Sequence, residues 1–88
     1  WRLPFYKDYD KELSSEFTDL NNAPLSGMAG AITAALFLKK FTKNHNTFLH
    51  FDIFGWNTKS EPGKTYGGLM QGVRSLGTVI EEKILKLN

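Results

Sequence analysis

The stretch that decides the fold is MAGAITAALFLKKF, residues 28–41. Ala, Leu, Met and Lys dominate it, and because these residues have high helix propensity it predicts a helix from Met28 to Phe41. Ser26 is the expected N-cap. The apolar residues run around the helix instead of forming one stripe, and such a helix is normally buried on most sides. We therefore expect it in the interior of a domain.

The segment that follows reads as a buried strand. TFLHFDIFGW, residues 47–56, is densely apolar and rich in aromatic and β-branched residues, which is typical of a strand. Both of its faces are mostly apolar, as in a parallel sheet that helices cover on each side. Residues 57–68 then form a long loop with Pro62 and three glycines, and long loops in compact domains are often functional.

The two ends of the chain complete the pattern. The C-terminal segment from Met70 to Leu87 predicts an amphipathic helix, because apolar residues recur at three- and four-residue spacing: Val73, Leu76, Ile80, Ile84 and Leu87. Upstream we expect a short helix from Lys7 to Leu13 and a short strand from Phe17 to Asn21. The resulting order is βαβα, which favours an α/β fold with a mostly parallel sheet.

Length and composition narrow the function. The 88 residues, 10.0 kDa, allow one domain or a piece of one, and a chain this short is usually marginal alone. The formal net charge of +2 is too small for an electrostatic nucleic-acid binder, so we expect no nucleic-acid partner. No apolar run approaches the roughly 18 residues of a membrane span, so we expect no membrane partner either. There is no cysteine, which excludes disulfides and thiolate metal sites. Because the chain begins at Trp1, we expect either a processed product or a segment of something longer. A deeply buried helix in so short a chain is a hint of missing partners.

No group of residues indicates a catalytic site by itself. His50 and Asp52 lie two apart and share one strand face, which is compatible with a metal pair or a His–Asp relay. A buried polar pair that satisfies its own hydrogen bonds is favoured, because no third ligand has a useful spacing. The acidic residues near the start lack the spacing of a calcium loop and are expected to be solvated: Asp8, Asp10, Glu12 and Glu16.

Three blocks together resemble a known family. FTDLNNAPLSGMAGAITAALFLKKF at residues 17–41, FLHFDIFGW at 48–56 and the GG…QGVRSL motif within residues 67–76 resemble the C-terminal end of the leucyl (cytosol) aminopeptidase family. WRLPFYKDYDKELSSEF, residues 1–17, is similar to the family segment that precedes these blocks. The resemblance covers nearly all of the chain, in the right order and at the right separations.

The resemblance implies a fold and an activity. Residues 1–88 are expected to be the C-terminal segment of the catalytic domain, a three-layer α/β/α sandwich, with the upstream part absent. Family members are cytoplasmic, homohexameric metalloexopeptidases that use two zinc or manganese ions to release N-terminal, leucine-like amino acids from peptides. Their metal ligands and catalytic Lys and Arg belong upstream, so we expect no catalytic and no metal-binding residue in this segment. Asp19 and Asp52 match acidic family positions that are not ligands, and both are expected to be structural.

The resemblance also implies three substrate-binding positions. Ala23 matches the position that lines the pocket for the residue after the cut, where a larger aliphatic residue is usual. Phe54 and Asn57 match positions that line the pocket for the N-terminal side chain. Phe54 replaces a residue that is usually Ala, so we expect its ring to shrink or reshape this pocket.

Two functional hypotheses follow. The first is a segment of a metal-dependent leucyl-type aminopeptidase, enzymatically active as the full-length protein and inactive as 88 residues. The alternative is a non-catalytic structural or interaction module that keeps the fold. Intact metal ligands in the upstream sequence would favour the enzyme, and lost ligands would favour the module.

Overall fold

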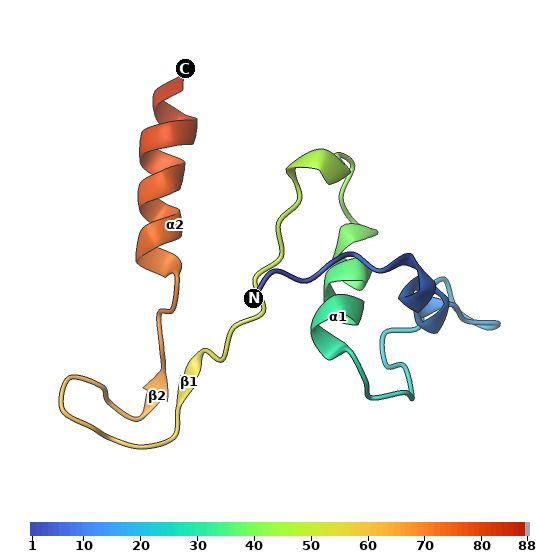
Figure 1. The fold of residues 1–88 in the computed structure, drawn as a ribbon, viewed down its shortest axis with the longest axis horizontal. Helices are drawn as coiled ribbons and strands as arrows, with labels where there is room; N and C mark the ends of the chain where they lie inside the picture. The colour runs from blue at the N-terminus through green and yellow to red at the C-terminus, as the bar shows by residue number, and fades with distance from the viewer. Residues whose placement is uncertain (88) are drawn as a thin grey trace. The chain divides into compact units, whose positions relative to one another are not determined.

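The computed structural model describes residues 1–87 (Figure 1). The chain divides into two compact units, Trp1–Phe51 and Asp52–Asn88, of which the second is described as far as residue 87. The first unit contains the 3-10 helix η1 (Lys7–Leu13), the α-helix α1 (Gly30–Lys39) and the 3-10 helix η2 (His45–Thr47). The second unit contains the strands β1 (Trp56–Asn57) and β2 (Gly67–Gly68). It ends in a run of helix formed by α2 (Val73–Val79), the π-helix η3 (Ile80–Ile84) and the 3-10 helix η4 (Leu85–Leu87).

The first unit is organised by the packing of η1 against α1. Leu13, the last residue of η1, is only 2% exposed. The Lys40 ammonium, just beyond α1, lies 2.9 Å from the Asp10 carboxylate of η1. The predicted helix from Lys7 to Leu13 is confirmed, and it is a 3-10 helix, which is wound more tightly than an α-helix.

The strand predicted from Phe17 to Asn21 is wrong, because these residues form bends. The backbone N–H of Thr18 donates to Ser15 Oγ at 3.1 Å, and the Thr18 hydroxyl donates to the Leu20 carbonyl at 2.9 Å. Such local side-chain bonds offer the backbone an alternative to a sheet ladder.

Helix α1 confirms the predicted helix but begins at Gly30, two residues after the predicted start. Ala29 precedes it with φ 53°, a left-handed conformation that is uncommon for a residue with a Cβ. The expected N-cap, Ser26, is wrong: its hydroxyl donates to Glu12 Oε2, and no side chain caps α1. At the other end, the Thr42 N–H donates to the Lys39 carbonyl at 3.0 Å and tightens the last turn.

The exposed residues of α1 lie along one stripe of the helix, at four-residue spacing: Gly30, Ala34 and Leu38. Thr33, Ala35 and Leu36 are each less than a tenth exposed, whereas Leu38 is 45% exposed. The other seven residues of α1 are buried or half-buried, so the expectation of burial on most sides is confirmed. Helix η1, which packs against α1, contributes to this burial.

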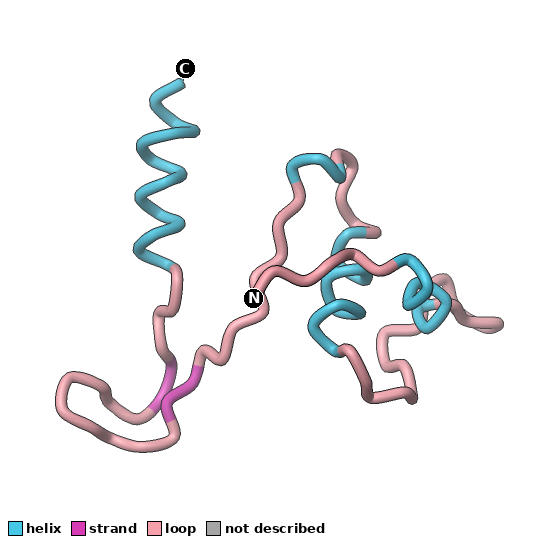
Figure 2. Tube along the Cα trace, viewed as in Figure 1, coloured by secondary structure: helices cyan, strands magenta, loops and turns pink. Residues whose placement is uncertain are grey.

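Of the strand predicted from Thr47 to Trp56, only Trp56 lies in a strand of the structure, β1. Residues 48–55 form no strand (Figure 2), and the Phe51 and Ile53 side chains are exposed. β1 pairs with β2 in antiparallel register, Trp56 opposite Gly68 and Asn57 opposite Gly67. The described residues thus hold an antiparallel hairpin and not the predicted parallel sheet, because a parallel strand needs a neighbour that these residues do not supply.

The predicted C-terminal helix is confirmed, but it begins at Val73 instead of Met70. Gly72 precedes it with φ 72°, a conformation that glycine adopts at little cost. Its apolar stripe is exposed along the described length: Val73 at 48%, Leu76 at 38%, Ile80 at 46% and Ile84 at 57%. The mixture of helices and a small sheet is compatible with the α/β class.

No helix among residues 1–87 combines the length and the apolar character needed to cross a membrane.

We predict that the isolated 88-residue chain does not unfold as a cooperative monomer. Its large apolar side chains, such as Leu25 at 102% and Phe17 at 94% exposure, favour association over a stable monomer. Light scattering combined with thermal unfolding followed by circular dichroism checks this. A monodisperse 10.0 kDa monomer with one sharp transition would contradict the prediction.

Candidate functional site

The three predicted substrate-binding residues are divided between the two units. Ala23 lies in the loop that precedes α1, in the first unit. Phe54 and Asn57 lie in the second unit, the first just before β1 and the second within it.

The loop that carries Ala23 is anchored to η1 through Asn21. The Asn21 N–H donates to the Leu13 carbonyl at 2.9 Å, and its side-chain amide donates to the Glu12 carbonyl at 3.2 Å. Asn21 Oδ1 in turn accepts from the Ala23 N–H at 3.0 Å. A single asparagine therefore ties the backbone at Ala23 to the end of η1.

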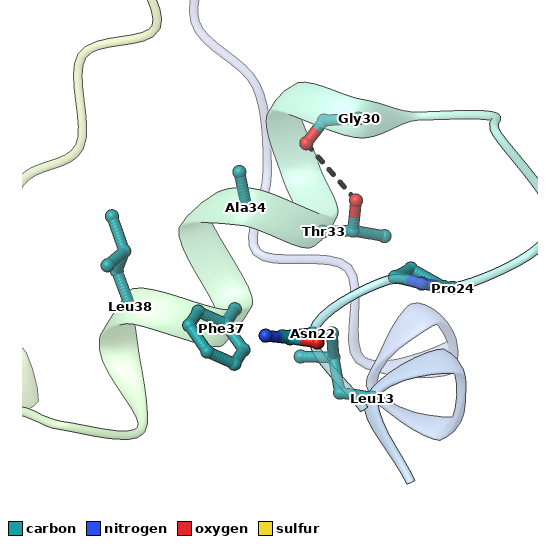
Figure 3. Close-up of a pocket in the computed structure, with 8 residues that line it drawn as sticks. All are labelled: Leu13, Asn22, Pro24, Gly30, Thr33, Ala34, Phe37 and Leu38. Atoms are coloured by element: carbon teal, nitrogen blue, oxygen red, sulfur yellow. Dashed lines mark hydrogen bonds between the residues drawn. The ribbon is translucent and has the colours of Figure 1, made fainter. Parts of the chain in front are cut away.

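A pocket of about 360 Å³ opens beside this loop (Figure 3). Asn22 and Pro24, the two neighbours of Ala23, line it from one side together with Leu13, and α1 supplies the other side. The residues from α1 are Gly30, Thr33, Ala34, Phe37 and Leu38. The Thr33 hydroxyl donates to the Gly30 carbonyl at 3.1 Å, the bond drawn in Figure 3.

The chemistry of this pocket is that of an apolar binding surface. None of its lining residues is titratable. Its volume lies at the lower end of the range of small-molecule pockets, roughly 300–1,000 Å³. It can therefore hold an apolar group, but it supplies no acid, base or nucleophile.

The Phe54 side chain is 72% exposed, and a hydrogen bond holds the backbone directly after it. The carbonyl of Gly55, the next residue, accepts a hydrogen bond from the Leu69 N–H at 2.8 Å. This bond extends the β1–β2 ladder by one step. Phe54 is therefore the residue directly before the ladder, and its ring projects from the hairpin there.

The Asn57 side chain contacts the chain's own backbone. Its Nδ2 donates to the Thr65 carbonyl at 2.9 Å and to the Lys64 carbonyl at 3.4 Å. Its Oδ1 accepts from the Lys59 N–H at 3.5 Å. We did not predict these contacts from the sequence, although an asparagine at the start of a loop is a known turn-former and was the available signal.

The described residues do not fit a metal centre. No three side chains of His, Asp or Glu within residues 1–87 lie close enough together to share a metal ion. The Asp52 carboxylate is exposed, and His50 Nε2 is buried without a hydrogen-bond partner in the described structure. The expectation that His50 satisfies its own hydrogen bonds is therefore wrong for this atom.

Two of the acidic residues near the start of the chain make side-chain contacts that we did not expect. Asp10 pairs with Lys40, and Glu12 accepts from the Ser26 hydroxyl, so these two carboxylates hold η1 to its neighbours. The expectation of a purely solvated acidic face is wrong for both.

Comparison with known proteins gives one consistent result. The sequence model of the cytosol aminopeptidase family, catalytic domain, matches residues 1–77. A probable cytosol aminopeptidase of Chlorobium phaeobacteroides is 46% identical over 77 residues, which is 86% of this chain and 15% of the relative. A probable cytosol aminopeptidase of Buchnera aphidicola subsp. Schizaphis graminum is 44% identical over 88 residues, which is 98% of this chain and 17% of the relative.

The fold comparison agrees. The crystal structure of a cytosol aminopeptidase from Coxiella burnetii matches with a TM-score of 0.74 and 42% sequence identity, over 94% of this chain and 18% of that protein. The chain thus spans less than a fifth of the length of each of these relatives. From the matched family model and these identities, we conclude that the chain belongs to the cytosol aminopeptidase family.

Proposed function

We propose that this chain is the C-terminal segment of a metal-dependent aminopeptidase that releases N-terminal amino acids, leucine-like ones among them, from peptides. The observation that supports this most directly is the match of residues 1–77 to the family's catalytic domain. The named relatives, all cytosol aminopeptidases or probable ones, support it as well.

The proposed role of the segment is architectural. In the full-length protein it contributes the last elements of a three-layer α/β/α sandwich and part of the substrate pocket. The two metal ions, zinc or manganese, belong to ligands elsewhere in the protein. The absence of a three-ligand cluster within residues 1–87 is compatible with that division.

The three family positions are proposed to help build the substrate pockets. Ala23 contributes to the pocket for the residue after the cut, and the apolar surface beside its loop suits an aliphatic side chain. Phe54 and Asn57 contribute to the pocket for the N-terminal side chain. We further propose that the full-length protein works in the cytoplasm as a homohexamer.

The central test compares the full-length protein with the segment. We expect the full-length protein to hydrolyse a leucine anilide, to lose this activity with a chelator and to recover it with zinc or manganese. We expect the pure 88-residue chain to show no hydrolysis, because it offers no metal centre among its described residues. Absorbance of the released aniline measures both.

Three results would contradict this proposal. Metal-dependent hydrolysis by the segment alone would show that the chemistry lies within it. A full-length protein without peptidase activity, or a natural product with an intact mass near 10.0 kDa, would favour the non-catalytic module instead.

A second prediction concerns the size of the N-terminal pocket. Phe54→Ala in the full-length protein should raise kcat/KM for a leucine substrate relative to an alanine substrate by about 10-fold. The reason is that removing the ring opens apolar volume, and each methylene accommodated in an apolar pocket changes discrimination by about 10- to 200-fold. Steady-state kinetics on the two anilides measures the ratio.

Phe17→Ala is the matched control, because Phe17 is 94% exposed and lies in the other unit. We expect it to leave the ratio unchanged. An unchanged ratio in Phe54→Ala would show that the ring does not face the substrate.

A further inference from the structure

The hairpin formed by residues 55–69 has a short ladder and a long loop. Only two residues on each strand pair, Trp56 with Gly68 and Asn57 with Gly67, and the Leu69–Gly55 bond adds one more link. Between the strands lie residues 58–66, and closing a loop of this length costs conformational entropy. So short a ladder leaves the loop dependent on further contacts for a single conformation.

The tip of the loop closes on itself. The backbones of Glu61 and Lys64 exchange two hydrogen bonds, of 2.8 and 2.9 Å, around Pro62 and Gly63. Gly63 has φ +76°, the conformation that the third position of a Pro-Gly turn requires. This turn sets the shape of the tip, but it does not by itself connect the tip to the strands.

Asn57 makes that connection. The Asn57 side chain leaves β1 and reaches the backbone on the returning side of the loop, with its strongest bond 2.9 Å long, to the Thr65 carbonyl. Asn57 Nδ2 also donates a longer hydrogen bond to the Lys64 carbonyl, and Asn57 Oδ1 accepts one from the Lys59 N–H. The Trp56 and Tyr66 rings, edge to face with centroids 5.6 Å apart, add a second side-chain contact within the hairpin.

An asparagine amide has two N–H donors and one carbonyl acceptor. In Asn57 the amide nitrogen is bonded to two carbonyls and the oxygen to one N–H, all of them in the loop. The side chain is therefore committed to the protein backbone and has no donor left for a peptide substrate.

We propose that Asn57 is a positioning residue: its amide holds the 58–66 loop closed on the hairpin from which Phe54 projects, and so sets the wall of the N-terminal side-chain pocket without contacting the substrate. This inference rests on the proposed aminopeptidase function for its link to substrate, whereas the hold on the loop stands on the hydrogen bonds alone.

The test uses the full-length protein with Asn57→Asp and Asn57→Ala, and Thr58→Ala as a control. Asn57→Asp keeps the size of the side chain and removes the donor to the Thr65 carbonyl. Thr58 is the adjacent exposed residue, and its side chain makes no hydrogen bond in the described structure. Two readouts are taken: the rate of limited tryptic cleavage after Lys59 and Lys64, by mass spectrometry, and KM and kcat on a leucine anilide.

We expect both Asn57 variants to be cleaved in the loop about 2- to 10-fold faster than wild type, the range that corresponds to the loss of one ordinary hydrogen bond. KM should rise with little change in kcat, and Thr58→Ala should match wild type in both readouts. The proteolysis readout would not move if Asn57 acted only on the substrate.

Wild-type cleavage rates in both Asn57 variants would overturn the proposal, whether or not KM rises. Faster cleavage with an unchanged KM would overturn its link to the pocket. If the wild-type protein has no peptidase activity, the proposed function fails, and the cleavage rates still decide whether Asn57 holds the loop.

Discussion

The packing of η1 on α1 is the contact on which the first unit depends. It buries Leu13 and places the Asp10–Lys40 ion pair across the two helices. Because Asn21 bonds to the backbone at the end of η1, the same packing places the loop that carries Ala23. The pocket beside Ala23 is thus a product of helix packing. If Leu13 no longer packed against α1, the loop and the pocket wall would no longer be held in position.

The chain carries more apolar surface than it can cover. Few side chains are deeply buried, whereas large ones such as Phe54 and Leu49 are mostly exposed. Contiguous exposed apolar surface usually marks a contact with other protein. The chain spans less than a fifth of its relatives' length, and under the proposed function the rest of a catalytic domain supplies that contact. The exposed stripe of α1 and the segment 48–54, which forms no strand, then have a physical explanation in common.

Sequence reasoning succeeded where the structure is local. The helices at Lys7–Leu13, in α1 and at the C-terminus were predicted because a helix satisfies its hydrogen bonds within its own segment. It failed for the sheet, because a strand needs a partner elsewhere in the chain. For the site, Ala23, Phe54 and Asn57 came from the family resemblance and not from residue chemistry. Their substrate-binding roles remain predictions, although the surroundings of each are now described.

By itself, the sequence determined the family, the positions of the helices to within a few residues and the lack of an evident catalytic group. These properties are read from composition, spacing and motif, which do not depend on distant contacts. Tertiary structure alone decided that α1 starts after a left-handed Ala29, that the hairpin is antiparallel and that Asn57 bonds to its own loop. Each of these depends on which backbone groups meet in space. Sequence periodicity reports which face of an element is apolar, but it does not report which partner that face will find.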